Sequence, residues 1–412
     1  MARPPGAGAL LPVAVAAATV AACGGEAPGG GAHGGPGDGP STVRRDSAGV
    51  EVVVNDSTDR PLGWTFRKEL EVGSVERPET AFHELPEQAV VFDTAGRLYV
   101  LDAGNHRIVV FDAEGQHVAT FGEEGRGPGH LDNPVAIWTR GGGDTIEVLD
   151  WAQGSVVRFT ADGGALETRP APVSAGIDDR IRPLPAGLVT TLQRGFRDRS
   201  ADSTVVSLVR VSPGDTTSLA SMTRVATSPS RFSSCNLRVW DRPVFEPSLV
   251  WDARQDRAAV AASVDYRIRW LVGGEPRRIV VRTLPPEPVT AEDAAAELRH
   301  RYGQGPDGEI EMADCPVDAR ERVEKRGHRS RLQPIDRIRI DPRDRLWVRR
   351  SAVAGKGPVD VFDADGTYLG TLPPDAPYPV AFASATRFAA VYTDEFDVPR
   401  VAVYRVVTDG PG

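Results

Sequence analysis

The sequence predicts an all-β protein, a six-bladed β-propeller, because one strand-rich phrase recurs six times along its 412 residues. In the three clearest copies, two β-rich runs are followed by an Ala-Asp-Gly or Ala-Glu-Gly turn that suits a hairpin. The copies begin at Gly96, Asp144, Gly187, Asp256, Asp344 and Thr386. Their spacings are 48, 43, 69, 88 and 42 residues, and the three shorter values are typical of propeller blades.

The two longer spacings predict insertions near residues 222–246 and 287–331. In the second insertion, Thr290 and Asp293 form a capping-box-like start before a run of helix-forming residues that ends at Gly303. The sequence therefore predicts a short helical insertion between blades four and five. Links from the outer strand of one blade to the inner strand of the next emerge on one face of a propeller, so both insertions are expected on that face.

The N-terminal residues are expected to close the ring, because an open ring would leave bare sheet edges. The Gly-rich connector at 122–134, between the first two blades, has a counterpart at 73–86. The strand at about 64–72 is therefore expected to be the outer strand of the last blade. Residues 50–54 are expected to lie in the same blade, beside Arg400–Val407.

The first residues have the features of an export signal. Arg3 precedes an apolar run from Ala7 to Ala22, which Gly8 and Pro12 interrupt. This run is too short and too broken to span a bilayer as a helix. Residues 24–42 contain nine Gly in 19 positions, as in a flexible tether. We therefore predict a signal peptide at 1–22, a tether at 23–45 and a folded body at 46–410.

The segment Val20-Ala21-Ala22-Cys23 resembles the lipobox of bacterial lipoproteins. The resemblance implies that Cys23 carries a lipid, which would anchor the body to a membrane on the extracytoplasmic side of the cell envelope. The next residue is Gly24 rather than Asp, which by analogy with proteobacterial sorting favours the outer membrane over the inner one. The alternative is an ordinary cleaved signal with an incidental cysteine.

The repeated phrase and its Gly-rich connector resemble the NHL-type six-bladed β-propellers. The segment Asp46–Asn55 is similar to the corresponding part of bacterial six-bladed β-propeller lipoproteins. The resemblance covers about residues 46–407 and implies the architecture rather than a particular chemistry.

Two cysteines remain after Cys23, and one lies in each insertion. If the body is exported to an oxidising compartment, Cys235 and Cys315 are expected to form a disulfide.

The sequence contains no recognisable catalytic or metal-binding motif. The seven histidines are scattered, and no G-x-S-x-G, P-loop, H-E-x-x-H or C-x-x-C pattern occurs. No catalytic residue, cofactor or metal ligand is therefore predicted. Asp102 and Asp150 end equivalent strands, where we expect them to accept loop N–H groups or to pair with a neighbour such as Arg107. A net charge of −9 argues against nucleic-acid binding.

A candidate binding face follows from the loops that join second and third strands. These loops carry His106, Trp151 and Lys356, and the helical insertion around Arg299 and His300 is expected to frame them. Such a face suits a protein, a carbohydrate or an anionic ligand. The first function class is therefore an exported, membrane-anchored binding or scaffolding module.

The alternative is an enzyme, a propeller hydrolase or lactonase that resembles the gluconolactonase type and uses a divalent metal in the central channel. No matching set of metal ligands is recognisable in the sequence, so binding is favoured over catalysis.

Overall fold

The structure, a computed structural model, describes residues 42–171, 177–184, 187–194, 203–212, 214–225, 228–232, 237–262, 264–303, 309–312 and 315–408. All of them belong to one unit, Pro40–Gly412. The predicted signal peptide, Cys23, the tether up to residue 41 and Cys235 lie outside the described residues.

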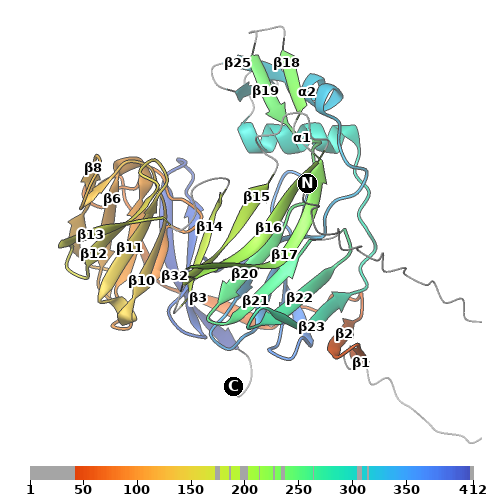
Figure 1. The fold of residues 1–412 in the computed structure, drawn as a ribbon, viewed down its shortest axis with the longest axis horizontal. Helices are drawn as coiled ribbons and strands as arrows, with labels where there is room; N and C mark the ends of the chain where they lie inside the picture. Colours follow the sequence, from red (N-terminus) through yellow and green to blue (C-terminus); the bar gives the residue numbers. More distant parts are fainter. Residues whose placement is uncertain are drawn as a thin grey trace, which may run out of the picture. The chain divides into compact units, whose positions relative to one another are not determined.

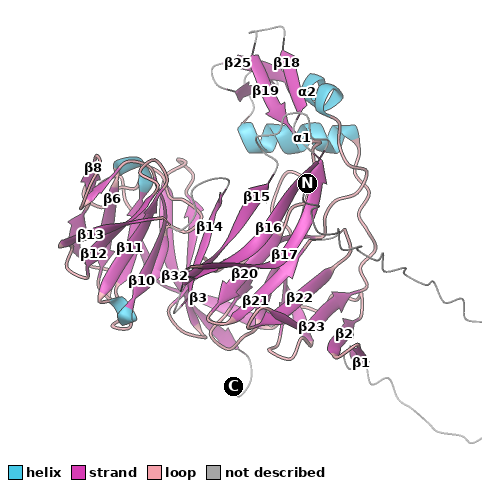
Figure 2. Cartoon of the chain, in the orientation of Figure 1, coloured by secondary structure: helices cyan, strands magenta, loops and turns pink. Residues whose placement is uncertain are grey.

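Most of this unit is built from six four-stranded antiparallel blades (Figures 1 and 2). Blade I contains β4 (Val90–Phe92), β5 (Leu98–Asp102), β6 (Arg107–Phe111) and β7 (His117–Phe121). Blade II contains β10 (Pro134–Arg140), β11 (Thr145–Asp150), β12 (Ser155–Thr160) and β13 (Ala165–Pro170). Blade III contains β14 (Ile177–Leu184), β15 (Gly187–Arg194), β16 (Ser203–Ser212) and β17 (Asp215–Val225).

Blade IV contains β20 (Val250–Arg254), β21 (Arg257–Ala261), β22 (Arg267–Val272) and β23 (Glu275–Arg282). Blade V contains β26 (Ile335–Ile340), β27 (Leu346–Arg350), β28 (Val359–Phe362) and β29 (Tyr368–Leu372). Blade VI contains β30 (Ala381–Phe382), β31 (Arg387–Thr393), β32 (Pro399–Thr408) and the N-terminal β3 (Trp64–Val72). A short parallel pair, β8 (Glu123–Glu124) and β9 (His130–Leu131), lies between blades I and II in the sequence.

The first strands of blades I to V contact one another in order, and β30 of the last blade contacts β4 of the first. The second strands of blades I, II, IV and V are almost wholly buried, because each blade is covered by its two neighbours; all five residues of β5 are buried, for example. The predicted all-β, six-bladed propeller arrangement is therefore confirmed. No helix in the described segments is long and apolar enough to cross a membrane.

The N-terminal residues 42–72, here called the N-terminal strap, follow the outer edges of three blades. β1 (Thr42–Ser47) and β2 (Val50–Asn55) form a hairpin, and β2 pairs in parallel with β23 of blade IV. The chain then bridges to Thr371 of blade V through Arg60 and Leu62. Finally, β3 pairs antiparallel with β32 of blade VI.

The strap confirms one expectation about ring closure and corrects another. The strand at 64–72 is the outer strand of the last blade, as predicted. The assignment of residues 50–54 to that blade is wrong, because they extend blade IV instead. β1 begins at Thr42, so residues 42–45, which the sequence assigns to the tether, belong to a strand.

The two insertions contribute a small separate core. They contain the hairpin β18 (Ser228–Phe232) and β19 (Leu237–Asp241), α1 (Ala291–Tyr302), the hairpin β24 (Glu309–Met312) and β25 (Cys315–Asp318), and α2 (Ala319–Arg326) (Figure 1). α1 begins with a capping box in which Thr290 Oγ1 accepts from the Asp293 N–H, and Asp293 accepts from the Thr290 N–H. Val244 of the first insertion packs against buried side chains of the second, which joins them into one cluster.

Candidate functional site

A carboxylate in the link between β3 and β4 contacts arginines from two distant blades. Oε1 of Glu87 pairs with Arg180 of β14, with Nη2 of Arg339 at 3.0 Å and with Nη1 of Arg337 at 3.6 Å, both from β26. The neighbouring Gln88 holds this link in place, because its backbone O accepts from the Ile137 N–H and its Oε1 from the Ile181 N–H. Glu87 thereby connects blades III and V through the link that leads into blade I.

A second carboxylate lies among the same first strands. Asp252 of β20 is buried, pairs with Arg182 of β14 and accepts from the Ile340 N–H at 2.8 Å. Together with a fifth guanidinium on β27, these groups form what we call the arginine cluster, whose members are Arg180, Arg182, Arg337, Arg339, Arg349, Glu87 and Asp252. The cluster contains five guanidinium groups and two carboxylates, so it is locally positive in a protein of net charge −9.

Burial and mutual repulsion shape the ionisation of the cluster. Burial acts to raise the pKa of Glu87, but Arg180, Arg339 and Arg337 outweigh it, so this pKa lies well below its usual range. Burial lowers the pKa of Arg180, and the nearby Arg339 lowers it further. Burial likewise lowers the pKa of Arg349. Burial acts to lower the pKa of Arg339 too, but Asp252 and Glu87 outweigh it, so this pKa is raised. The carboxylates thus compensate Arg339 more fully than Arg180 or Arg349.

Two pockets adjoin Glu87. The first, here called the Trp151 pocket, has a volume of about 710 Å³; its lining includes His83, His106, Asn133, Trp151 and Arg180. The second, here called the Arg349 pocket, has a volume of about 690 Å³; its lining includes Arg337, Arg349, Lys356, Tyr378, Tyr392 and Tyr404. Both volumes are in the range of small-molecule sites.

The predicted face residues fall around these pockets. His106 and Trp151 line the Trp151 pocket, and Lys356 lines the Arg349 pocket. Arg299 and His300 line neither pocket but lie on α1. That helix reaches the β27–β28 loop, where Oε2 of Glu297 accepts from the Ala354 N–H at 2.9 Å. The helical insertion therefore touches the loop that carries Lys356.

Sequence reasoning missed the arginine cluster, although a signal was present. The tetrapeptide Asp-Arg-Ile-Arg occurs at 179–182 and again at 336–339, in the first strands of blades III and V. Alternate residues of a strand share a face, so both arginines of each copy project to the same side. The intervening Ile181 and Ile338 are fully buried on the other side.

Asp102 and Asp150 have the expected structural role. Asp102 is buried, pairs with Arg107 at 3.0 Å and accepts from the His83 N–H. Asp150 is buried as well and accepts from the Asp132 and Gln153 N–H groups. Both carboxylates hold loops in place and are already engaged.

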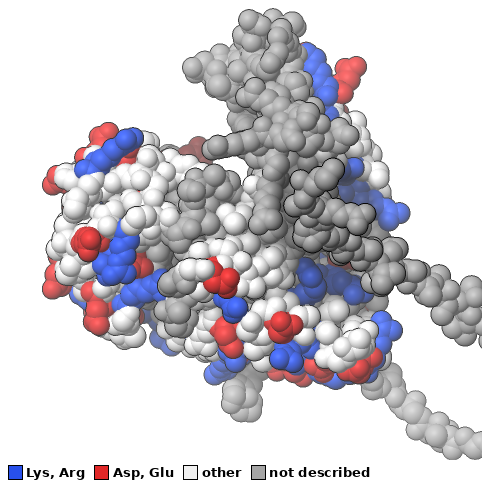
Figure 3. Space-filling model, viewed as in Figure 1, with Lys and Arg blue, Asp and Glu red and all other residues white. Residues whose placement is uncertain are grey.

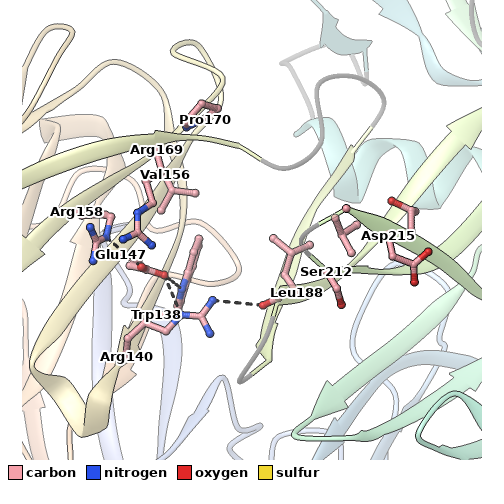
Figure 4. A pocket seen from close by; sticks show the side chains of 14 residues that line it. Trp138, Arg140, Glu147, Val156, Arg158, Arg169, Pro170, Leu188, Ser212 and Asp215 are labelled. Atoms are coloured by element: carbon pink, nitrogen blue, oxygen red, sulfur yellow. Dashed lines mark hydrogen bonds and ion pairs between the residues drawn. The ribbon is translucent and has the colours of Figure 1, made fainter.

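A further cavity of about 790 Å³ lies between blades II and III (Figure 4). Two acidic residues line it, Glu147 and the exposed Asp215. Glu147 accepts from Trp138 Nε1 at 2.6 Å and pairs with Arg140 and Arg158. Arg140 also bonds the carbonyl of Gly187 across the gap. Because Glu147 and the groups around it satisfy one another, they have less capacity to bind a ligand than the arginine cluster has.

The described segments contain no group of three or more His, Cys, Asp or Glu side chains arranged to hold a metal ion. On the face seen in Figure 3, basic and acidic side chains are interspersed, without a broad basic surface. The fold and the cluster together define a six-bladed β-propeller with an arginine-rich centre.

The comparisons with known proteins agree with the six-bladed propeller fold. Residues 85–184 match the model of the DUF5128 family, described as a 6-bladed beta-propeller. No curated protein matches. One similar solved structure is that of a Bacteroides fragilis protein whose name describes it as expected to be exported. The identity is 13% and the TM-score 0.50, and the match covers 87% of this chain and 100% of that one.

Two other solved structures are similar at a lower level. A member of the duf4221 family from Bacteroides vulgatus has 10% identity and a TM-score of 0.47, covering 85% of this chain and 100% of its own. The calcium-binding protein regucalcin from Agrobacterium tumefaciens has 14% identity and a TM-score of 0.38, covering 86% and 96%. At these identities the likeness concerns the fold alone.

Proposed function

We propose that this protein is an exported, lipid-anchored binding module that holds its ligand at the arginine cluster, on the face that carries His106, Trp151 and Lys356. One observation carries the proposal: two pockets of small-molecule size adjoin Glu87, their linings include residues of loops and links, and α1 contacts the loop that carries Lys356. The blades themselves use their side chains to bury sheet against sheet, whereas loops at one end are free for recognition.

Export and anchoring rest on the sequence. The apolar N-terminal run, the lipobox-like Val20–Cys23 and the Gly-rich tether support a lipoprotein of the cell envelope, with the outer membrane favoured over the inner one. The expected export of the Bacteroides fragilis relative agrees with this localisation. The resemblance to NHL-type propellers supports the same blade arrangement.

The arginine cluster favours binding over the alternative of a metal-dependent hydrolase or lactonase. A divalent cation needs carboxylates that are free to coordinate it. Glu87 and Asp252 already pair with guanidinium groups, and the surplus positive charge would repel a cation. An anionic ligand is the natural complement of this centre.

Hydrogen exchange of the mature protein would test the proposed face. The probes are a panel of acidic and neutral sugars and acidic peptides, each at saturating concentration. We expect a bound probe to protect amides in residues 83–87, 103–106, 151–154 or 351–358. Protection confined to the turns at the opposite ends of the blades, such as 94–96 and 343–344, would overturn the proposal.

A further inference from the structure

Arg349 is a buried cation for which the described residues provide no ion pair; the nearby Asp336 acts on it only through its long-range field. The exposure of Arg349 is 8%, and its Nε has no hydrogen-bond partner. Its guanidinium lies over the ring of Tyr378, 4.2 Å from the ring centre. Strand β27 places it at the wall of the Arg349 pocket, beside Arg337, its partner in the register of β26 and β27.

The rest of the pocket adds to the positive charge. Lys356 is exposed on its loop, and Arg337 lies 3.6 Å from Glu87 and 3.4 Å from Asp336, without a hydrogen bond to either. Two carboxylates line the pocket, Glu87 and Asp375. Glu87 is engaged by Arg180 and Arg339, and Asp375 is exposed to solvent. Lys68 also lines the pocket and pairs with Glu71.

A buried guanidinium without an ion pair opposes folding, because burial removes its hydration and the ring of Tyr378 replaces only part of it. The chain contains 57 acidic residues, so a partner could have been supplied from within. A guanidinium presents a planar set of donors that fits a carboxylate or a phosphate oxygen pair. An external oxyanion would satisfy Arg349 and use the charge that the fold leaves uncompensated.

The remaining wall of the pocket is apolar and aromatic. The lining includes Leu85, Pro86, Val380 and Val391, together with Tyr378, Tyr392 and Tyr404. Such a wall favours the flat faces of a ring, and a volume of about 690 Å³ exceeds what an inorganic anion needs. The ligand should therefore combine a ring with a charged group.

We infer that the Arg349 pocket binds a small ring-bearing organic acid, whose carboxylate or phosphate group pairs with Arg349. This inference rests on the proposed function and names the chemistry of its ligand. Arg337 and Lys356 contribute long-range attraction, and the tyrosines contact the ring.

Isothermal titration of the mature protein would test the inference. The probes are glucuronate, glucose 6-phosphate and benzoate, with glucose as the neutral counterpart. At least one of the three anions is expected to bind with Kd below about 1 mM, and glucose is expected to bind far more weakly. Comparison of glucuronate with glucose 6-phosphate distinguishes a carboxylate from a phosphate.

Arg349→Met should weaken binding of that anion by about tenfold or more, because a hydrogen-bonded charge pair is lost. Arg343→Met is the matched control, since Arg343 is exposed in the turn before β27, at the opposite end of the same strand. The thermal midpoint of Arg349→Met should equal or exceed that of the wild type, because no internal ion pair is broken. A structural role for Arg349 would instead lower the midpoint.

Three results would overturn the inference and leave the proposed function standing. In the first, none of the three anions binds, while another probe protects the face loops. In the second, an anion binds, but Arg349→Met leaves its affinity unchanged. In the third, Trp151→Ala weakens binding of the anion more than Arg349→Met does. If hydrogen exchange shows that every bound probe protects only the turns at the opposite ends of the blades, the proposed function is overturned as well.

Discussion

Nη2 of Arg339 lies 3.0 Å from Oε1 of Glu87, although 252 residues separate the two in the sequence. The same carboxylate pairs with Arg180, so one side chain holds together first strands that belong to blades III and V. Contacts between neighbouring blades are mainly apolar, whereas this connection is ionic and crosses the centre of the ring. The stability of the ring centre therefore depends on the ionised state of Glu87.

Glu87→Gln is expected to lower the free energy of unfolding at neutral pH by about 2 kcal/mol, as in the loss of one member of a largely buried ion pair. The neutral amide removes the carboxylate that Arg180, Arg337 and Arg339 share, and their mutual repulsion is then less compensated. The side chain of Glu87 is 30% exposed, which keeps the loss below that of a fully buried pair. Urea unfolding measures the effect. Glu114→Gln, at an exposed turn of blade I, should leave the free energy unchanged.

The same carboxylate predicts how stability depends on pH. The folded-state pKa of Glu87 is lowered, while an unfolded glutamate titrates near about 4.3. Its contribution is therefore complete above that value and is lost as the pH falls. The difference in unfolding free energy between the wild type and Glu87→Gln should shrink from about pH 6 to about pH 3. An equal difference at both pH values would contradict the assignment.

The N-terminal strap predicts two different outcomes for two truncations. A chain that begins at Asp56 lacks β1 and β2, yet blade IV keeps its own four strands. It should unfold cooperatively with a lower midpoint. A chain that begins at Gly73 also lacks β3, which leaves β32 as a bare edge and the ring open. It should lose its cooperative transition in differential scanning calorimetry, and a sharp transition there would refute closure by β3.

The strap also shows where sequence reasoning succeeds and where it fails. β3 was placed because the Gly-rich segments at 73–86 and 122–134 occupy equivalent positions in the repeat. β2 was misplaced because the pattern of residues 50–55 specifies a buried strand but no partner. The position of β2 depends on groups that are distant in the sequence. Arg278 pairs with Glu51 at 2.7 Å, and Asn55 Oδ1 accepts a hydrogen bond from the Tyr368 N–H.

Some residues of the candidate site can likewise be predicted from the sequence, and others cannot. His106 and Trp151 were identified because the repeat defines its loops, and any side chain in an equivalent loop shares the face. Glu87 stands in a link without periodicity, and its partners are 93 and 252 residues away. The two Asp-Arg-Ile-Arg copies were visible, but only the ring shows that their arginines meet at its centre.

Cys23→Ser is expected to release the protein from the membrane fraction, because the substitution removes the thiol that the lipid would modify. Fractionation of cell envelopes and metabolic labelling with a fatty acid measure the change. Cys315→Ser is the matched control and should stay with the membrane. Retention of Cys23→Ser, or an unlabelled wild type, would contradict the lipid anchor.

The predicted Cys235–Cys315 disulfide would join two insertions that already pack together. The Val244 N–H donates to the Gly327 carbonyl at 2.9 Å, and the Arg329 N–H donates to the Val244 carbonyl at 2.9 Å. Cys315 begins β25, which belongs to this packed region, whereas Cys235, between β18 and β19 in the sequence, lies outside the described residues.

Thiol titration of the mature Cys23→Ser variant, denatured without reductant, should find no free thiol, and reduction should release two. Closing a separation of 80 residues would stabilise the native state by about 4 kcal/mol in the chain-entropy model. Reduction should therefore lower the unfolding midpoint of the wild type and leave that of Cys315→Ser unchanged. Two free thiols before reduction, with equal midpoints in both states, would show that apolar packing around Val244 joins the insertions without a disulfide.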